Sequence, residues 1–163
     1  IACYQIDSMP FLQHMVKMKL LFLGLFLSFS LHGQIQPTPI KELDHKMKTH
    51  PQKVLILLST DWCAYCEVSK KLMKNGQIST RTNQSFYYVE FDAETTDPIL
   101  FNGYEFKPTS KSKTHPLALA LNENKKNIAY PLWVILNEKY EIIYSKPGFL
   151  KPKQLQQLID ALN

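Results

Sequence analysis

Two cysteines in a C-x-x-C arrangement follow a nearly continuous apolar segment, and this combination constrains the fold more than any other feature. The apolar segment covers residues 53–59 and is typical of a strand buried on both faces of a sheet. We expect Cys63 to begin a helix over residues 63–75, where unpaired N–H groups and the helix dipole favour a thiolate. Cys66 then lies on the same helix face and can resolve a mixed disulfide. The pattern therefore predicts thiol–disulfide exchange.

The composition indicates one globular domain and gives no sign of nucleic-acid binding. The chain has 163 residues, of which 45% are apolar and 20% are charged, enough for one domain with a hydrophobic core. The net charge of +5 comes from Lys and Arg residues that are scattered along the chain, without a dense basic block. We therefore expect a mildly basic, solvated surface and no nucleic-acid partner.

The N-terminal part has the pattern of an export signal. Lys17 and Lys19 precede an apolar run over residues 20–31. At about 12 residues, this run is well short of the ~20 that a membrane-spanning helix needs. A buried core helix or an uncleaved anchor is the alternative. We predict a signal peptide over residues 18–33 and a periplasmic or secreted protein.

This prediction sets the expected domain boundaries and the number of cysteines in the exported protein. With Met18 as the start, residues 1–17 are an upstream segment that we do not expect in the native mature protein, and residues 34–163 form the mature domain. Cys3 lies upstream of the signal. The mature chain therefore has no framework of structural disulfides, and its C-x-x-C pair is the one bridge that it can form.

Elsewhere the apolar periodicity predicts alternating helices and strands. Helices are expected over residues 40–48, 63–75, 116–122 and 152–162. Strands are expected over residues 53–59, 86–92, 132–136 and 140–144. Prolines, an Asn-Gly pair and a Thr-Ser-Lys-Ser-Lys-Thr run favour loop for the rest of residues 94–127.

This order of elements resembles the thioredoxin fold. The Trp-Cys-x-x-Cys segment opens a helix, and a Tyr-Pro pair precedes a late strand that is followed by a hairpin and a terminal amphipathic helix. The Asp-Trp-Cys sequence at residues 61–63 and Ala-Tyr-Pro at 129–131 are similar to exported thioredoxin-like domains, such as the periplasmic parts of thiol:disulfide interchange proteins. The resemblance implies an α/β fold, with a central mixed sheet flanked by helices, and an exported thiol–disulfide oxidoreductase.

The C-x-x-C segment supplies most of the predicted site. Cys63 is expected to be the nucleophile and Cys66 the resolving thiol. The resemblance implies that Trp62 is a lid beside the reactive sulfur, and that Tyr65 fills a position that tunes the redox potential. Ala64 completes this part of the predicted substrate groove. Because no His lies between the cysteines, we expect a reducing or intermediate potential rather than a strong oxidant.

Tyr130 and Pro131 supply the rest of the predicted groove. From the sequence alone, Pro131 would be an ordinary proline at the start of a strand, because few X-Pro bonds in folded proteins are cis. The resemblance implies instead that Pro131 is cis and lies against the C-x-x-C. It also implies that the backbone of Tyr130 pairs with the bound partner chain, where Pro131 has no competing N–H.

One position departs from the resemblance. Thioredoxins commonly bury an Asp six residues before the first Cys, where it accepts the proton of the resolving thiol, and this chain has Leu57 there. Asp61 and Glu67 are near in sequence, but we expect both to be solvated surface charges. His115 and residues 101–106 could border the groove, although loop filler is the safer interpretation.

No metal ligands or dissociable cofactor are expected. A structural zinc would need two ligands besides the cysteines, and His45, His50 and His115 form no second close-spaced pair. The c-type haem signature is excluded because Glu67, not His, follows the second Cys. The redox-active disulfide itself is the expected reactive group.

We expect the partners to be proteins. Protein disulfides or thiols are the predicted substrates, and a membrane partner is expected to supply electrons if the domain works as a reductant in an oxidising compartment. The alternative is a non-enzymatic thioredoxin-fold module that binds Cu(I) or a protein partner through the same thiols.

Overall fold

The computed structural model describes residues 35–75, 78, 85–123, 125 and 127–162. The upstream segment 1–17, the predicted signal peptide over 18–33 and the expected first mature residue, 34, lie outside the described residues. Within the described ranges, no helix is both long enough and apolar enough to cross a bilayer.

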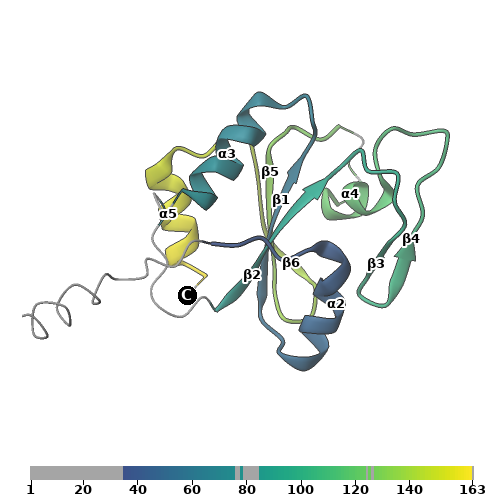
Figure 1. Ribbon diagram of the computed structural model, residues 1–163, viewed down its shortest axis with the longest axis horizontal. Helices are drawn as coiled ribbons and strands as arrows, with labels where there is room; N and C mark the ends of the chain where they lie inside the picture. Colours follow the sequence, from purple (N-terminus) through teal and green to yellow (C-terminus); the bar gives the residue numbers. More distant parts are fainter. Residues whose placement is uncertain (1–34, 76–77, 79–84, 124, 126, 163) are drawn as a thin grey trace, which may run out of the picture. The chain divides into compact units, whose positions relative to one another are not determined.

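A four-stranded mixed sheet forms the centre of the domain, in the order β2-β1-β5-β6 (Figure 1). Strand β1 pairs in parallel with β2 and antiparallel with β5, and β5 pairs antiparallel with β6. The strands are β1 (Lys53–Ser59), β2 (Phe86–Asp92), β5 (Leu132–Leu136) and β6 (Ile142–Pro147). The predicted strands over 53–59, 86–92 and 132–136 are confirmed to the residue.

Helices cover both faces of this sheet, which explains the continuous apolar run of β1. Figure 1 shows α2 (Ile40–Thr49) and α4 (Pro116–Leu121) on one side of the sheet, and α3 (Ala64–Lys74) and α5 (Pro152–Asp160) on the other. Alternate residues of β1 therefore enter two separate cores: Ile56 packs with α2 and α4, whereas Leu57 packs with α3 and α5. All four predicted helices are confirmed, with ends that differ by one or two residues.

The loop predicted over residues 94–127 is wrong at its first part, where the structure has a short hairpin. Strand β3 (Ile99–Phe101) pairs antiparallel with β4 (Tyr104–Phe106). The turn residues Asn102 and Gly103 have φ values of 52° and 72°, which is the conformation that a two-residue hairpin turn requires and that Asn-Gly favours. The same Asn-Gly pair that suggested a loop therefore makes a turn, and residues 101–106 are not loop filler.

The last strand also differs from the prediction, because its first two predicted residues belong to the turn. Strand β6 begins at Ile142 instead of residue 140, and it runs on to Pro147. Tyr140 has a φ of 63°, outside the strand region, and the Asn137 side chain accepts hydrogen bonds from the backbone N–H groups of Lys139 and Glu141. The side-chain bonds of Asn137 thus extend the turn at the expense of the strand.

Candidate active site

Cys63 and Cys66 form a disulfide at the start of α3, with their Cα atoms 5.2 Å apart. Cys63 is the N-cap residue of the helix, and its Sγ accepts a hydrogen bond from the backbone N–H of Cys66 at 3.2 Å. The backbone N–H of Cys63 donates to the carbonyl of Thr60, just beyond β1, at 3.1 Å. The tight turn from a buried strand into a helix therefore fixes the position of both sulfurs.

The two cysteines differ in exposure. Cys63 keeps 7% of its surface exposed, whereas Cys66 is fully buried. Thiol–disulfide exchange requires that a partner sulfur approach one sulfur directly. The geometry therefore leaves Cys63 more accessible to a partner than Cys66.

Tyr130 lies beside the C-x-x-C segment, because its ring contacts that of Trp62. The Tyr130–Pro131 peptide bond is cis, as the resemblance implies. The rings of Trp62 and Tyr130 meet edge to face, with centroids 5.9 Å apart. Pro131 is buried, and its carbonyl accepts a hydrogen bond from the backbone N–H of Gly148 at 2.7 Å. The structure thus brings together residues from the C-x-x-C turn and from the start of β5.

A second aromatic pair involves Tyr65, which lies between the two cysteines. The ring of Tyr65 packs on Phe149, with centroids 5.6 Å apart and planes inclined by 36°. Ala64, between the cysteines, is exposed. Sequence reasoning missed Phe149, because its contact with Tyr65 depends on the reversal of the chain after β6 and has no local signal in the sequence.

Glu94 also belongs to the site and was missed. Its Oε2 accepts a hydrogen bond from Trp62 Nε1 at 3.1 Å. Parallel strands end at the same edge of a sheet, so the residues after β2 lie beside those after β1; the backbone N–H of Ala93 indeed donates to the carbonyl of Ser59 at 2.8 Å. The parallel pairing was the signal that could have placed Glu94 near the cysteines.

Acidic side chains act on Tyr130, the aromatic residue that contacts Trp62. Partial burial, followed by the negative charges of Glu94 and Asp92, raises the pKa of Tyr130 to about 12. Tyr130 therefore stays a neutral phenol at physiological pH.

Neither the position where thioredoxins commonly bury an Asp nor the nearby Glu67 supplies a buried acid. Leu57 is fully buried and lies between Glu90 on β2 and Trp133 on β5 in the sheet register. Glu67 is exposed and forms an ion pair with Lys70 at 2.8 Å, which lowers its pKa. Glu67 is thus the solvated charge that the sequence predicted.

His115 lies in the scaffold and not in the groove. It is 1% exposed and caps α4: its Nδ1 accepts from the backbone N–H of Leu117, and its Nε2 lies 3.1 Å from the carbonyl oxygen of Asp97. His45 and His50 are both exposed. Across the residues that the structure describes, no cluster of three or more His, Cys, Asp or Glu residues could hold a metal ion.

Known proteins resemble this chain in structure but not detectably in sequence. No protein-family model and no curated protein matches it. A mutant thioredoxin from Halobacterium salinarum superposes with a TM-score of 0.50 at 14% identity, covering 82% of this chain and 96% of the thioredoxin. A redox protein from Chlamydomonas reinhardtii gives a TM-score of 0.51 at 14% identity, covering 83% of this chain and 38% of that protein. At such identities the likeness establishes a shared fold.

Proposed function

We propose that this chain, which has the thioredoxin fold, is a thiol–disulfide oxidoreductase that exchanges disulfides with protein partners. The observation that carries the proposal is the disulfide between Cys63 and Cys66 at the N-terminus of α3. Cys63 keeps 7% of its surface exposed and Cys66 is fully buried, which suits a pair that alternates between disulfide and dithiol.

The exchange proceeds in two balanced steps. In the dithiol form, the Cys63 thiolate attacks one sulfur of the partner disulfide, forms a mixed disulfide and expels the other partner sulfur as a thiolate. The Cys66 thiolate then attacks Sγ of Cys63, which closes the Cys63–Cys66 disulfide and releases the second partner thiolate. Two electrons and two protons pass to the partner, and the reverse sequence oxidises a partner dithiol.

The helix start supports the thiolate that both directions need. The backbone N–H of Cys66 donates to Cys63 Sγ, and the positive end of the α3 dipole favours negative charge at the same atom. Both interactions act more strongly on a thiolate than on a neutral thiol. Cys63 is therefore both the better nucleophile and the better leaving group of the pair.

The groove proposed for the partner chain is bordered by the two aromatic pairs. The backbone of Tyr130 pairs with an extended partner segment, and Pro131 leaves no competing N–H. Trp62 and Tyr65 flank the reactive sulfur. Because no His stands between the cysteines, the proposal includes a reducing or intermediate potential.

Export and the electron supply are part of the same proposal. A signal peptide over residues 18–33 would deliver the domain to the periplasm or the exterior. That compartment is oxidising, so a reductant there needs a membrane electron donor to restore its dithiol.

The test measures exchange with a synthetic peptide disulfide in wild type, Cys63→Ser and Cys66→Ser. We expect turnover in wild type, none in Cys63→Ser, and a trapped mixed disulfide in Cys66→Ser, because that variant cannot complete the second step. The reduction potential of the pair distinguishes a reductase, near about −270 mV, from an oxidant, near about −120 mV. Turnover in Cys63→Ser, or stoichiometric Cu(I) binding without exchange, would contradict the proposal.

A further inference from the structure

We propose that a lysine-bearing cavity beside Trp62 binds acidic side chains of the disulfide partner and so selects the proteins on which this domain acts. The inference rests on the proposed thiol–disulfide exchange and adds a substrate class to it. Its ligand is the carboxylate of an Asp or Glu in the partner polypeptide.

The cavity has a volume of about 450 Å³ and is formed by two separate segments. One segment follows β2 and the other connects β4 to α4. The lining residues are Glu94, Thr95, Thr96, Pro108, Thr109, Ser110, Lys111, Ser112 and Lys113.

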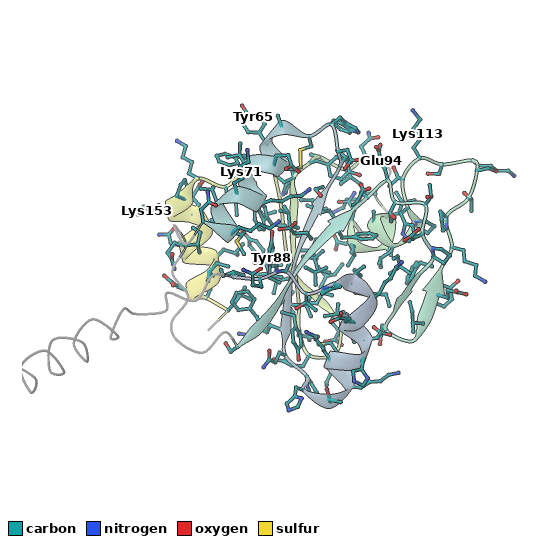
Figure 2. All side chains as sticks on the ribbon, viewed as in Figure 1. Tyr65, Lys71, Tyr88, Glu94, Lys113 and Lys153 are labelled. Carbon is teal, nitrogen blue, oxygen red and sulfur yellow. A yellow bond between two sulfur atoms is a disulfide. The ribbon has the colours of Figure 1, made fainter. Side chains whose placement is uncertain are left out.

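Glu94 links this cavity to the disulfide. It lines the cavity and accepts the hydrogen bond of Trp62 Nε1, and Trp62 directly precedes Cys63. Figure 2 shows Glu94 and Lys113 near each other at the upper right of the view. A partner chain that leaves the reactive sulfur past Trp62 therefore passes over the cavity.

The lining offers cations and hydroxyl groups that can bind a carboxylate. Lys111 and Lys113 are exposed, and neither forms an ion pair with an acid among the described residues. By contrast, the neighbouring Lys107 is paired with Glu105 at 2.8 Å. Among the described lining residues Glu94 is the only acid, and its Oε2 is engaged by Trp62. Two unpaired ammonium groups beside several hydroxyls are therefore available to a carboxylate.

Internal hydrogen bonds order the segment that carries the two lysines. The Ser112 hydroxyl donates to the Thr114 carbonyl at 3.0 Å and accepts from the Thr114 backbone N–H at 3.1 Å. The backbone N–H of Ser112 donates to the carbonyl of Thr109 at 3.3 Å. At the end of this segment, the backbone N–H of the buried His115 donates to the carbonyl of Ala93 at 2.7 Å. An ordered segment loses less entropy when it binds a partner.

The charges around the groove determine where the acidic residue of the partner lies. Glu94 and Asp92 act electrostatically on Tyr130, so an acidic side chain next to the reactive cysteine would be repelled. In the cavity beyond Trp62, the two positive charges of Lys111 and Lys113 outweigh the one negative charge of Glu94. The preferred partner therefore carries its acidic residues a few positions away from the cysteine, on the Trp62 side.

The test measures second-order rate constants of exchange for three peptides. Each peptide has one cysteine, which is disulfide-bonded to a chromophoric thiol. Three residues on one side of the cysteine are Glu, Gln or Lys. At low ionic strength, wild type should react about tenfold faster with the Glu peptide than with the Gln peptide. The preference should fall close to one in the Lys111→Gln/Lys113→Gln double variant, and also in wild type at high salt.

The matched control is the Lys139→Gln/Lys153→Gln double variant, which changes the net charge equally at exposed positions outside the cavity lining. Figure 2 shows Lys153 on α5, away from Glu94 and Lys113. This control should keep the Glu preference.

Two results would overturn the inference alone: equal wild-type rates for the Glu and Gln peptides, or an equal loss of preference in the control. Both leave the proposed exchange intact, because the Gln peptide still reports it. Absence of exchange with all three peptides would overturn the proposed function as well.

Discussion

The Asp44 carboxylate and the Cys63–Cys66 disulfide are two centres of the domain whose surroundings differ. Asp44 is 5% exposed and accepts hydrogen bonds from the backbone N–H groups of Asn102 and Gly103, at 2.7 and 2.8 Å, and from the Tyr140 hydroxyl, at 2.8 Å. The disulfide is bordered instead by large exposed rings.

The two centres differ in whether the groups around them are buried and bonded within the chain. Trp62 is 68% exposed and Tyr65 is 65% exposed, although both are apolar enough to favour burial. At Asp44 the bonds join α2 to the β3–β4 turn and the β5–β6 turn within one chain. The comparison teaches that the buried carboxylate of the scaffold is satisfied within the chain, whereas the aromatic rings beside the disulfide stay exposed.

The largest expected effect is on the scaffold side, in Asp44→Ala. This change removes a buried carboxylate and leaves two backbone donors and a hydroxyl without their acceptor, so we expect a loss of about 3 kcal/mol in the free energy of unfolding. Exchange by the folded fraction should stay within about twofold of wild type, because the two centres are separate. Urea unfolding and peptide exchange measure the two quantities.

Tyr140→Phe is the control, because it removes a single donor and should cost about 1 kcal/mol. Equal losses in the two variants would show that Asp44 does not join the turns as a group.

A smaller effect, on the other side of the comparison, is expected for Trp62→Ala. Removing the ring should slow exchange with a peptide disulfide about tenfold, since exposed aromatics at interfaces contribute strongly to binding. The free energy of unfolding should change by less than about 1.5 kcal/mol, the value of one aromatic pair.

Tyr104→Ala is its matched control. Tyr104 is 66% exposed and packs edge to face on Phe106, but it lies on the β3–β4 hairpin. If both substitutions slow exchange equally, the rings around the disulfide have no special role.

The smallest expected effect is the pH dependence of stability that comes from His115 in the scaffold. Burial outweighs the backbone hydrogen bonds with Asp97 and Phe106 and lowers the pKa of His115 below its usual 6.5. The unfolded chain therefore binds this proton more readily, and stability should fall as the pH drops below about 6.5 and stay constant above it.

Urea unfolding between pH 7.5 and 5 measures this slope. His115→Asn keeps an N-cap acceptor for α4 without a titrating ring, so its stability should vary less with pH. An unchanged slope in His115→Asn would assign the effect to other groups.

The sequence predicted those parts of the fold that rest on local pattern. The apolar run at 53–59 is buried on both faces, and the prediction of a thioredoxin fold with a central mixed sheet is confirmed. Strands β3 and β4 were missed because three residues are too few to show a period, and because Asn-Gly marks turns of several kinds.

The candidate site was predicted where its residues adjoin the cysteines in sequence or where, for Tyr130 and Pro131, the resemblance to the thioredoxin fold implied them. Glu94 and Phe149 lie near the C-x-x-C segment only because of strand pairing and chain reversal, so no local pattern could indicate them. The roles of Cys63 and Cys66 remain predictions that the exchange assay tests.

The connection from β4 to α4 is tied down at both ends by buried polar groups. Asp44 holds the β3–β4 turn before it, and His115 fixes the start of α4 after it. Neither anchor involves the side chains of Lys111 or Lys113. Substitutions between these two anchors can therefore change the proposed carboxylate-binding cavity while the positions of Cys63 and Cys66 stay the same.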